Sequence, residues 1–172
     1  MRSTRPPAII DIEASGFGVT SYPIEVGAVL ADGSKYCSLI LPAPGWTHWD
    51  EEAEQLHRIT RDILKAHGKP IHEVVGRLNE MLRNQTAYSD GWVVDKTWLD
   101  RLYFAAGVPC EFSLSSLEMI LTEPQMEVWH HTKDQVLCDL GERRHRASFD
   151  AQVVQETYER TRRASQSPEP LR

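Results

Sequence analysis

The stretch AIIDIE at residues 8–13 decides how this chain folds, because it sets two acids into a short apolar run. A proline precedes the run and a Ser-Gly pair follows soon after it, as is typical of a buried β-strand. Side chains alternate across a strand, so Asp11 and Glu13 share one face while the neighbouring isoleucines point to the other. Two carboxylates side by side on a buried strand are costly unless a cation lies between them. Mg²⁺ and Mn²⁺ prefer carboxylate oxygen, so the stretch predicts a divalent metal site at the end of the first strand.

The rest of the chain predicts further strands first, and then strands that alternate with helices. Asp32-Gly33 is a two-residue hairpin signal, so the runs on either side of it should pair antiparallel. Strands are predicted at 24–30, 35–41, 86–89 and 112–114, and helices at 50–57, 60–66, 70–83, 93–106, 115–140 (with a break near 122–124) and 147–163. This order of elements indicates an α/β or α+β layer fold.

The 172 residues fit one domain, which we expect to span 1–163 and to be followed by a disordered tail at 164–172. No apolar run approaches the ~20 residues that cross a bilayer, so no membrane attachment is expected. The three cysteines lie far apart and in no zinc-binding spacing, which predicts reduced thiols and a cytoplasmic location. The net charge of −6 argues against a general nucleic-acid coat, but metal ions bound to several acids would reverse the local sign.

Asp95 is a third candidate acid, because it lies on the apolar stripe of its predicted helix. The stripe consists of Trp98, Leu99 and Leu102, at i+3, i+4 and i+7. An acid in that position points into the protein, although a capping or solvated aspartate fits the spacing equally well. Asp90 competes for the same role, but it precedes Gly91 in a predicted turn, and we therefore assign it to the turn.

Asp150 and His145 complete the set near the end of the chain. Asp150 falls on the face of the last predicted helix that carries small and apolar side chains, and His145 lies just before that helix. The spacings themselves prove little, since Asp-x-Glu recurs at 50–52 and His-x4-Asp at 57–62, where helix starts explain the acids. Inward-facing acids on separate elements, with a histidine beside one of them, form a buried cluster that is hard to stabilise without metal.

The chain resembles the DEDDh 3′→5′ exonucleases, which include the bacterial proofreading exonuclease subunit, RNase T and oligoribonuclease. The resemblance covers roughly residues 7–160 and rests on motifs in a fixed order. The motifs are DIEASG at 11–16 with IEVGA at 24–28, LHRIT at 56–60, YSDGWVVD at 88–95 and HRASFDA at 145–151. The departures are Asp90-Gly91 where the family has His-Asn, Val94 where it prefers Phe, and Ala14-Ser15 where it has paired Thr. They bear on substrate preference more than on the reaction.

The resemblance implies a ribonuclease H-like α/β fold, with a mixed five-stranded sheet flanked by helices, and two divalent ions, Mg²⁺ or Mn²⁺. Asp11, Glu13 and Asp150 would hold one ion. Asp11 would also touch the second, and Asp95 would bind directly or through water. His145 would act as the general base that accepts a proton from the attacking water.

The implied product is a nucleoside 5′-monophosphate released from the 3′ end of single-stranded DNA or RNA, and several relatives are homodimers. Ser15 and Gly16 are expected to offer backbone or hydroxyl contacts to the terminal sugar. Phe17 either stacks on a base or is a core aromatic. Two other functions stay open: a non-catalytic nucleic-acid or polymerase-binding module on the same fold, and a phosphodiesterase of small nucleotides.

Two further groups have two interpretations each. Trp46, His48 and Trp49 form either a stacking surface or a packed corner after the third strand, and we expect the packed corner. The arginines beside His145 either meet phosphates or form a plain solvated surface. They are Arg143, Arg144 and Arg146.

Overall fold

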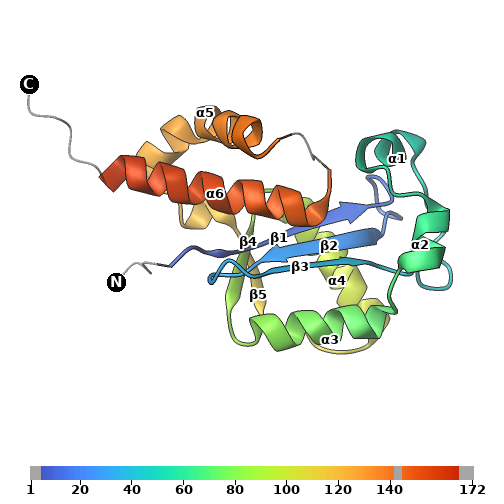
Figure 1. Cartoon of the computed structure of the whole chain (residues 1–172). Helices are drawn as coiled ribbons and strands as arrows, with labels where there is room; N and C mark the ends of the chain where they lie inside the picture. Colours follow the sequence, from blue (N-terminus) through green and yellow to red (C-terminus); the bar gives the residue numbers. More distant parts are fainter. Residues whose placement is uncertain (1–4, 142–144, 167–172) are drawn as a thin grey trace, which may run out of the picture.

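The computed structural model describes residues 5–141 and 145–166, which form a five-stranded sheet with helices on both faces (Figure 1). The strands are β1 (Ala8–Ala14), β2 (Pro23–Val29), β3 (Lys35–Leu39), β4 (Thr86–Ser89) and β5 (Ser113–Ser116), and the α-helices are α1 (Glu51–His57), α2 (Arg61–His67), α3 (Ile71–Leu82), α4 (Trp92–Ala106), α5 (Glu123–Leu140) and α6 (Ala147–Gln166). The predicted mixed five-stranded sheet flanked by helices is confirmed.

β1 lies at the centre of the sheet, whose strand order is β3-β2-β1-β4-β5. It pairs antiparallel with β2 and parallel with β4. The predicted hairpin between β2 and β3 forms, with Gly33 at a φ of 82° and the Asp32 carboxylate accepting from the Ser34 N–H at 2.9 Å. Because β1 and β4 run in the same direction, the loops that follow them leave from the same end of the sheet.

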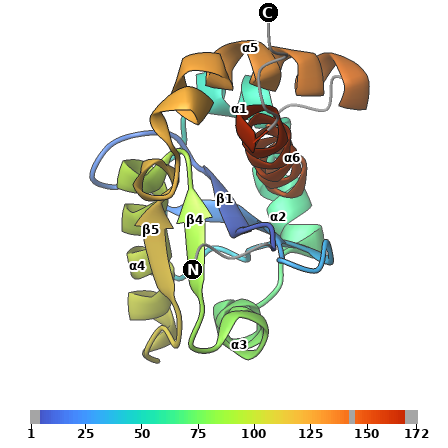
Figure 2. The ribbon, with the colours of Figure 1, turned by 90° about the vertical axis from the view of Figure 1, so that its left-hand side faces the viewer.

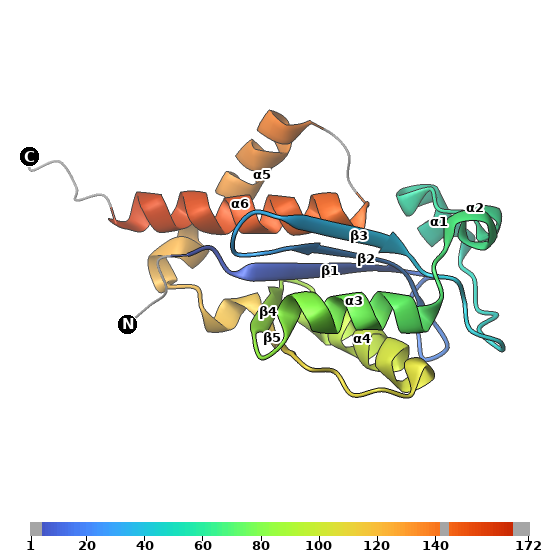
Figure 3. The same cartoon turned by 60° about the horizontal axis from the view of Figure 1, so that its bottom comes forward.

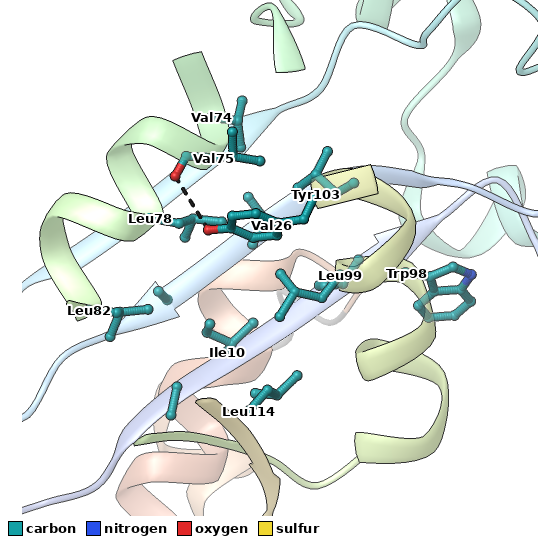
Figure 4. Close-up of a cluster of buried hydrophobic side chains, with 14 of the residues drawn as sticks. Ile10, Val26, Val74, Val75, Leu78, Leu82, Trp98, Leu99, Tyr103 and Leu114 are labelled. Atoms are coloured by element: carbon teal, nitrogen blue, oxygen red, sulfur yellow. Dashed lines mark hydrogen bonds between the residues drawn. The ribbon is translucent and has the colours of Figure 1, made fainter. Parts of the chain in front are cut away.

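The two faces of the sheet are covered by different helices, with α5 and α6 on one side and α3 and α4 on the other (Figures 1 and 2). Ile10 and Ile12 belong to the core under α3 and α4, while Ile9 packs on the other side with residues of α5 and α6. Figure 4 shows the first of these cores, where the Tyr103 hydroxyl donates to the Val75 carbonyl at 3.3 Å. The alternation predicted for residues 8–13 is therefore present.

The predicted helical region at 115–140 is wrong in its first part. Residues 113–116 form β5 because they pair with β4, and pairing at a sheet edge outweighs the helical pattern of the sequence. A 3₁₀ turn at Leu117–Met119 follows, and α5 begins only at Glu123. Thr122 caps α5 by accepting from the Gln125 N–H, so the predicted break near 122–124 is the start of the helix.

The ends of the other elements agree closely with the prediction. Asp50 and Thr60 cap α1 and α2, as side chains of this kind do at helix starts. α6 extends to Gln166, three residues beyond the predicted end at 163, and the remainder of the predicted tail, 167–172, lies outside the described residues. The three cysteines are free, and among the described helices none combines the length and the apolar character needed to cross a membrane. Figure 3 shows α6 lying along the strands.

Candidate active site

The structure brings the five predicted catalytic residues to one cleft at the end of β1. The cleft has a volume of about 290 Å³, and its lining includes Asp11, Glu13, Asp95, His145 and Asp150. The acids come from three elements, β1, α4 and α6, which meet here because β1 and β4 end on the same side. A larger hollow of about 530 Å³ lies at the opposite ends of β1 and β4, and its described lining includes no acid. The chemistry, not the size, marks the smaller cleft as the candidate site.

Asp95 reaches the cleft from the first turn of α4 and is only 3% exposed. The Ser89 hydroxyl, at the end of β4, donates to the Asp95 carboxylate and in turn accepts the Gly91 N–H at 3.0 Å. Asp90 instead accepts from the Lys133 ammonium of α5 at 2.7 Å. The described lining of the cleft thus includes Asp95 and not Asp90, while the catalytic role of Asp95 stays a prediction.

His145 and Asp150 are held together by a backbone contact, in which the His145 N–H donates to the Asp150 carboxylate at 2.9 Å. His145 has a φ of 63°, a left-handed conformation that is uncommon for a residue with a side chain. Glu13, His145 and Asp150 each offer a ligand atom within 4.8 Å of the others. This trio has the spacing and the donor types for a divalent cation.

Burial and mutual repulsion disfavour the charged form of the carboxylates in the site. Burial, together with Asp150 and Glu25, raises the pKa of Glu13 to about 7. Burial also raises the pKa of Asp95 to about 7, against the opposing effect of the Ser89 hydrogen bond. The pKa of Asp11 lies well above its usual range because of burial and then the charge of Asp95. Divalent cations would relieve this repulsion, so the donor set fits the predicted metal ions.

The residues 15–17, which follow the end of β1, have different roles. Phe17 is 72% exposed, lines the cleft and lies with its ring centroid 5.9 Å from that of Trp98, so it is no core aromatic. Gly16 also lines the cleft, at a φ of 134°. A Cβ there would come within 2.5 Å of the Asp50 Cβ, so the backbone requires glycine.

Ser15 is used inside the protein. Its hydroxyl accepts the Tyr22 N–H at 3.1 Å and lies 2.9 Å from His48 Nδ1, and only 1% of the residue is exposed. The predicted sugar contact of the Ser15 hydroxyl therefore has no support, because the hydroxyl holds the loop that carries Phe17.

The packed-corner interpretation of the tryptophan cluster is confirmed. The Trp46 ring stacks on Tyr22 with centroids 5.2 Å apart, and Arg61 lies over the Trp49 ring. The phosphate-binding interpretation is not supported for Arg146, which is paired with Glu25 at 2.6 Å. Arg143 and Arg144 lie outside the described residues.

Residues of α1 also line the cleft, and the sequence argument missed them. Leu56 is 59% exposed there, whereas His57 is 4% exposed. His57 Nδ1 accepts the Ile59 N–H at 3.0 Å, which leaves the ring proton on Nε2, and burial lowers the pKa of this ring. The motif LHRIT at 56–60 was the signal that could have found both residues.

Comparison with known proteins gives matches only at the level of structure. No model of a known protein family matches the chain, and no curated protein does. E. coli Exonuclease I, solved in complex with a dA16 oligonucleotide, matches with a TM-score of 0.67 at 12% identity, over 94% of this chain and 42% of that one. Exonuclease I from Methylocaldum szegediense matches with a TM-score of 0.71 at 12% identity, over 94% and 41%.

The fold is that of exonuclease I. A zinc-bound complex of the E. coli enzyme with single-stranded DNA also matches in fold, with a TM-score of 0.64 at 13% identity, over 97% of this chain and 42% of that one. The predicted α/β fold, a mixed five-stranded sheet flanked by helices, is thus confirmed. The chain spans about two fifths of the length of these proteins, and at such low identity the likeness concerns the fold alone.

Proposed function

We propose that this chain is a metal-dependent 3′→5′ exonuclease that releases nucleoside 5′-monophosphates from single-stranded DNA or RNA. One observation carries the proposal: four carboxylates from three elements, and one histidine, meet in one cleft at the end of β1. A protein that only bound nucleic acid would have no need of buried acids with raised pKa values. The likeness in fold to proteins crystallised with single-stranded oligonucleotides supports the same class of substrate.

Asp11, Glu13 and Asp150 would hold one metal ion, and Asp11 would also contact a second. Two such ions, Mg²⁺ or Mn²⁺, stabilise the attacking and the leaving oxygen of an in-line phosphoryl displacement. Asp95 would bind an ion directly or through water, and the Ser89 hydroxyl holds its carboxylate in either case. The carboxylates thus serve as ligands, since hard cations prefer oxygen donors.

His145 serves as the general base. Its backbone N–H is held by Asp150, so the ring stays at the edge of the acid cluster. The acids already supply the oxygen donors that Mg²⁺ prefers, which leaves the imidazole free to take the proton of the attacking water.

The rim of the cleft suits the end of a single strand. Phe17 and Leu56 are both apolar, exposed and part of the cleft lining. Bases stack on aromatic side chains such as Phe17 without regard to sequence, and Leu56 adds apolar surface beside it. A cleft of about 290 Å³ is at the lower end of ligand-site volumes, which favours one terminal nucleotide over a longer segment. We propose that Phe17, with the Gly16 backbone beside it, contacts this nucleotide.

A product assay tests the proposal. Matched DNA and RNA oligomers with a 5′ label, incubated with Mg²⁺ or Mn²⁺, should shorten one nucleotide at a time from the 3′ end and release 5′-monophosphates. Asp150→Asn serves as the inactive control. Binding without product release would favour the non-catalytic module, and cleavage of dinucleotides or an aryl phosphate alone would favour a small-nucleotide phosphodiesterase. Sedimentation of the same samples would test for a homodimer. We propose the cytoplasm as the location of the protein.

A further inference from the structure

Glu25 is a completely buried acid that lies outside the proposed catalytic set. It is 0% exposed and stands directly opposite Glu13 in the antiparallel pairing of β1 with β2. Opposed residues in such a pair share a face of the sheet, so Glu25 lies next to Glu13 on the face that carries the acid cluster. A buried carboxylate next to other acids is costly, and its partners must account for its presence.

Apart from one thiol, the partners of Glu25 are Arg146, directly before α6, and Ala147, the first residue of α6. Arg146 Nε donates to both carboxylate oxygens, at 3.0 and 3.2 Å, and an Arg146 terminal nitrogen donates to Oε1 at 2.6 Å. The Ala147 N–H donates to Oε2 at 2.9 Å, and the Cys37 thiol lies 3.4 Å from Oε1. Both oxygens therefore accept from several donors, and the guanidinium compensates the charge.

This contact lies between two proposed catalytic residues. Arg146 and Ala147 follow His145 directly and precede Asp150 by one turn of α6. The first turn of α6 lies directly on β2, since a Cβ on Gly27 would come within 2.1 Å of the Ser148 nitrogen. Glu25 thus fixes Arg146 and Ala147 to β2, and the bond from the His145 N–H to Asp150 holds His145 at the first turn of α6.

We propose that Glu25 is a positioning residue of the active site: it holds Arg146 and Ala147 so that His145 and Asp150 face Glu13 at working distance. The inference rests on the proposed function for its effect on catalysis. Glu25 itself contacts no reacting group. Its carboxylate sets the geometry of two groups that do, and reactions of this kind are sensitive to displacements of about 1 Å.

Two substitutions at Glu25 test the proposal by degree. Glu25→Gln keeps the shape but offers one acceptor oxygen, so its amide NH₂ must face either the guanidinium or the Ala147 N–H, donor against donor. Glu25→Ala removes both acceptors. We expect kcat to fall about 10-fold in Glu25→Gln and about 100-fold in Glu25→Ala, with KM within about threefold of the parent protein, because orientation is lost and not substrate contact.

A matched control lies further along α6. Glu159 is 8% exposed and pairs with Arg162 at 2.9 Å, so Glu159→Gln disturbs a buried Glu–Arg pair of α6 away from the cleft. Its kcat should stay within about twofold of the parent value at a temperature where all variants are folded. The positioning role would be overturned if kcat also stayed unchanged in Glu25→Gln and Glu25→Ala. It would equally be overturned if their losses of kcat only followed the fraction of folded protein.

A readout that needs no activity separates this inference from the proposed function. Amide hydrogen exchange of Ala147, followed by NMR, should speed up in Glu25→Ala and stay slow in Glu159→Gln, because only the first loses the acceptor of that N–H. Slow exchange in Glu25→Ala would overturn the inference even if the protein is a nuclease. Inactivity of the parent protein with Mg²⁺ and Mn²⁺, together with fast exchange in Glu25→Ala, would reject the proposed function and leave Glu25 as the residue that holds the loop.

Discussion

The face of β1 that carries Asp11 and Glu13 begins with the buried Ile9, but toward the end of the strand the two faces carry opposite chemistry. Ile10 and Ile12 lie in the apolar core under α3 and α4, whereas Asp11 and Glu13 join the acid cluster beside α6. The apolar face stabilises the fold, and the acidic face works against it, because burial and repulsion raise the pKa values of its carboxylates. One strand thus fixes a costly site in place with its own core contacts, which is how a site under electrostatic strain can persist.

The largest expected effect separates two acids that are close in sequence. Asp95→Asn should reduce turnover below detection, because it removes a carboxylate that lies in the cleft, while the metal-free protein should gain stability as repulsion is relieved. Asp90→Asn should keep most of the activity, since its partner is Lys133. Rates on a labelled oligomer and melting temperatures without metal provide the test. The reverse ranking of the two variants would overturn the choice of Asp95.

His145→Ala should slow the reaction about 10²–10⁴-fold, the usual contribution of a general base. The acids remain in place, so Mn²⁺ affinity, measured by calorimetry, should change little. The imidazole also lies close enough to Glu13 and Asp150 to bind the same metal ion, so the calorimetry decides whether His145 is a base or a metal ligand. A large loss of metal affinity in this variant would make His145 a ligand.

The apolar face of β1 should behave in the opposite way. Ile10→Ala is expected to lower the free energy of unfolding by about 2–5 kcal/mol, because Ile10 is 1% exposed and the methyl groups lost leave a cavity. Its kcat per folded molecule should remain near that of the parent protein. Chemical denaturation and active-site-normalised rates measure the two quantities. An equal loss in kcat would show that the faces are coupled.

The metal-free protein should lose stability as the pH rises. Glu13 and Asp95 have folded-state pKa values of about 7, above those of the unfolded chain, so the folded state binds more protons between about pH 4 and 7. Their contribution is therefore complete below about pH 4 and is lost as the pH passes 7. Melting temperatures across this range should fall, and added Mn²⁺ should restore them most at the upper end. A flat or rising profile without metal would contradict the repulsion inferred for this face.

The smallest effect is expected at the rim. Phe17→Ala should raise KM several-fold with little change in kcat, since stacking of a base on an aromatic side chain contributes about 1–3 kcal/mol. Phe104→Ala, which removes an even more exposed phenylalanine at the far end of α4, is the control. Equal KM values in the two variants would exclude Phe17 from the substrate site.

The sequence predicted the parts of the site that depend on local periodicity. Alternation along β1 placed Asp11 and Glu13 together, and the apolar stripe of α4 placed Asp95 inward. It could not predict contacts that depend on distant partners. The Ser15 hydroxyl is occupied by Tyr22, and residues 115–116 become strand only because β4 lies alongside.

The position of α6 against β1 and β2 has a consequence for synthesis on the ribosome. Asp150 and His145 emerge from the ribosome more than 130 residues after Asp11. Contacts between such distant segments form late in folding, because the intervening chain must close first. A growing chain that has already paired β1 with β2 therefore still lacks its base and one of its acids. The cleft is completed only when α6 docks, so the nascent protein is expected to be inert toward nucleic acid nearby.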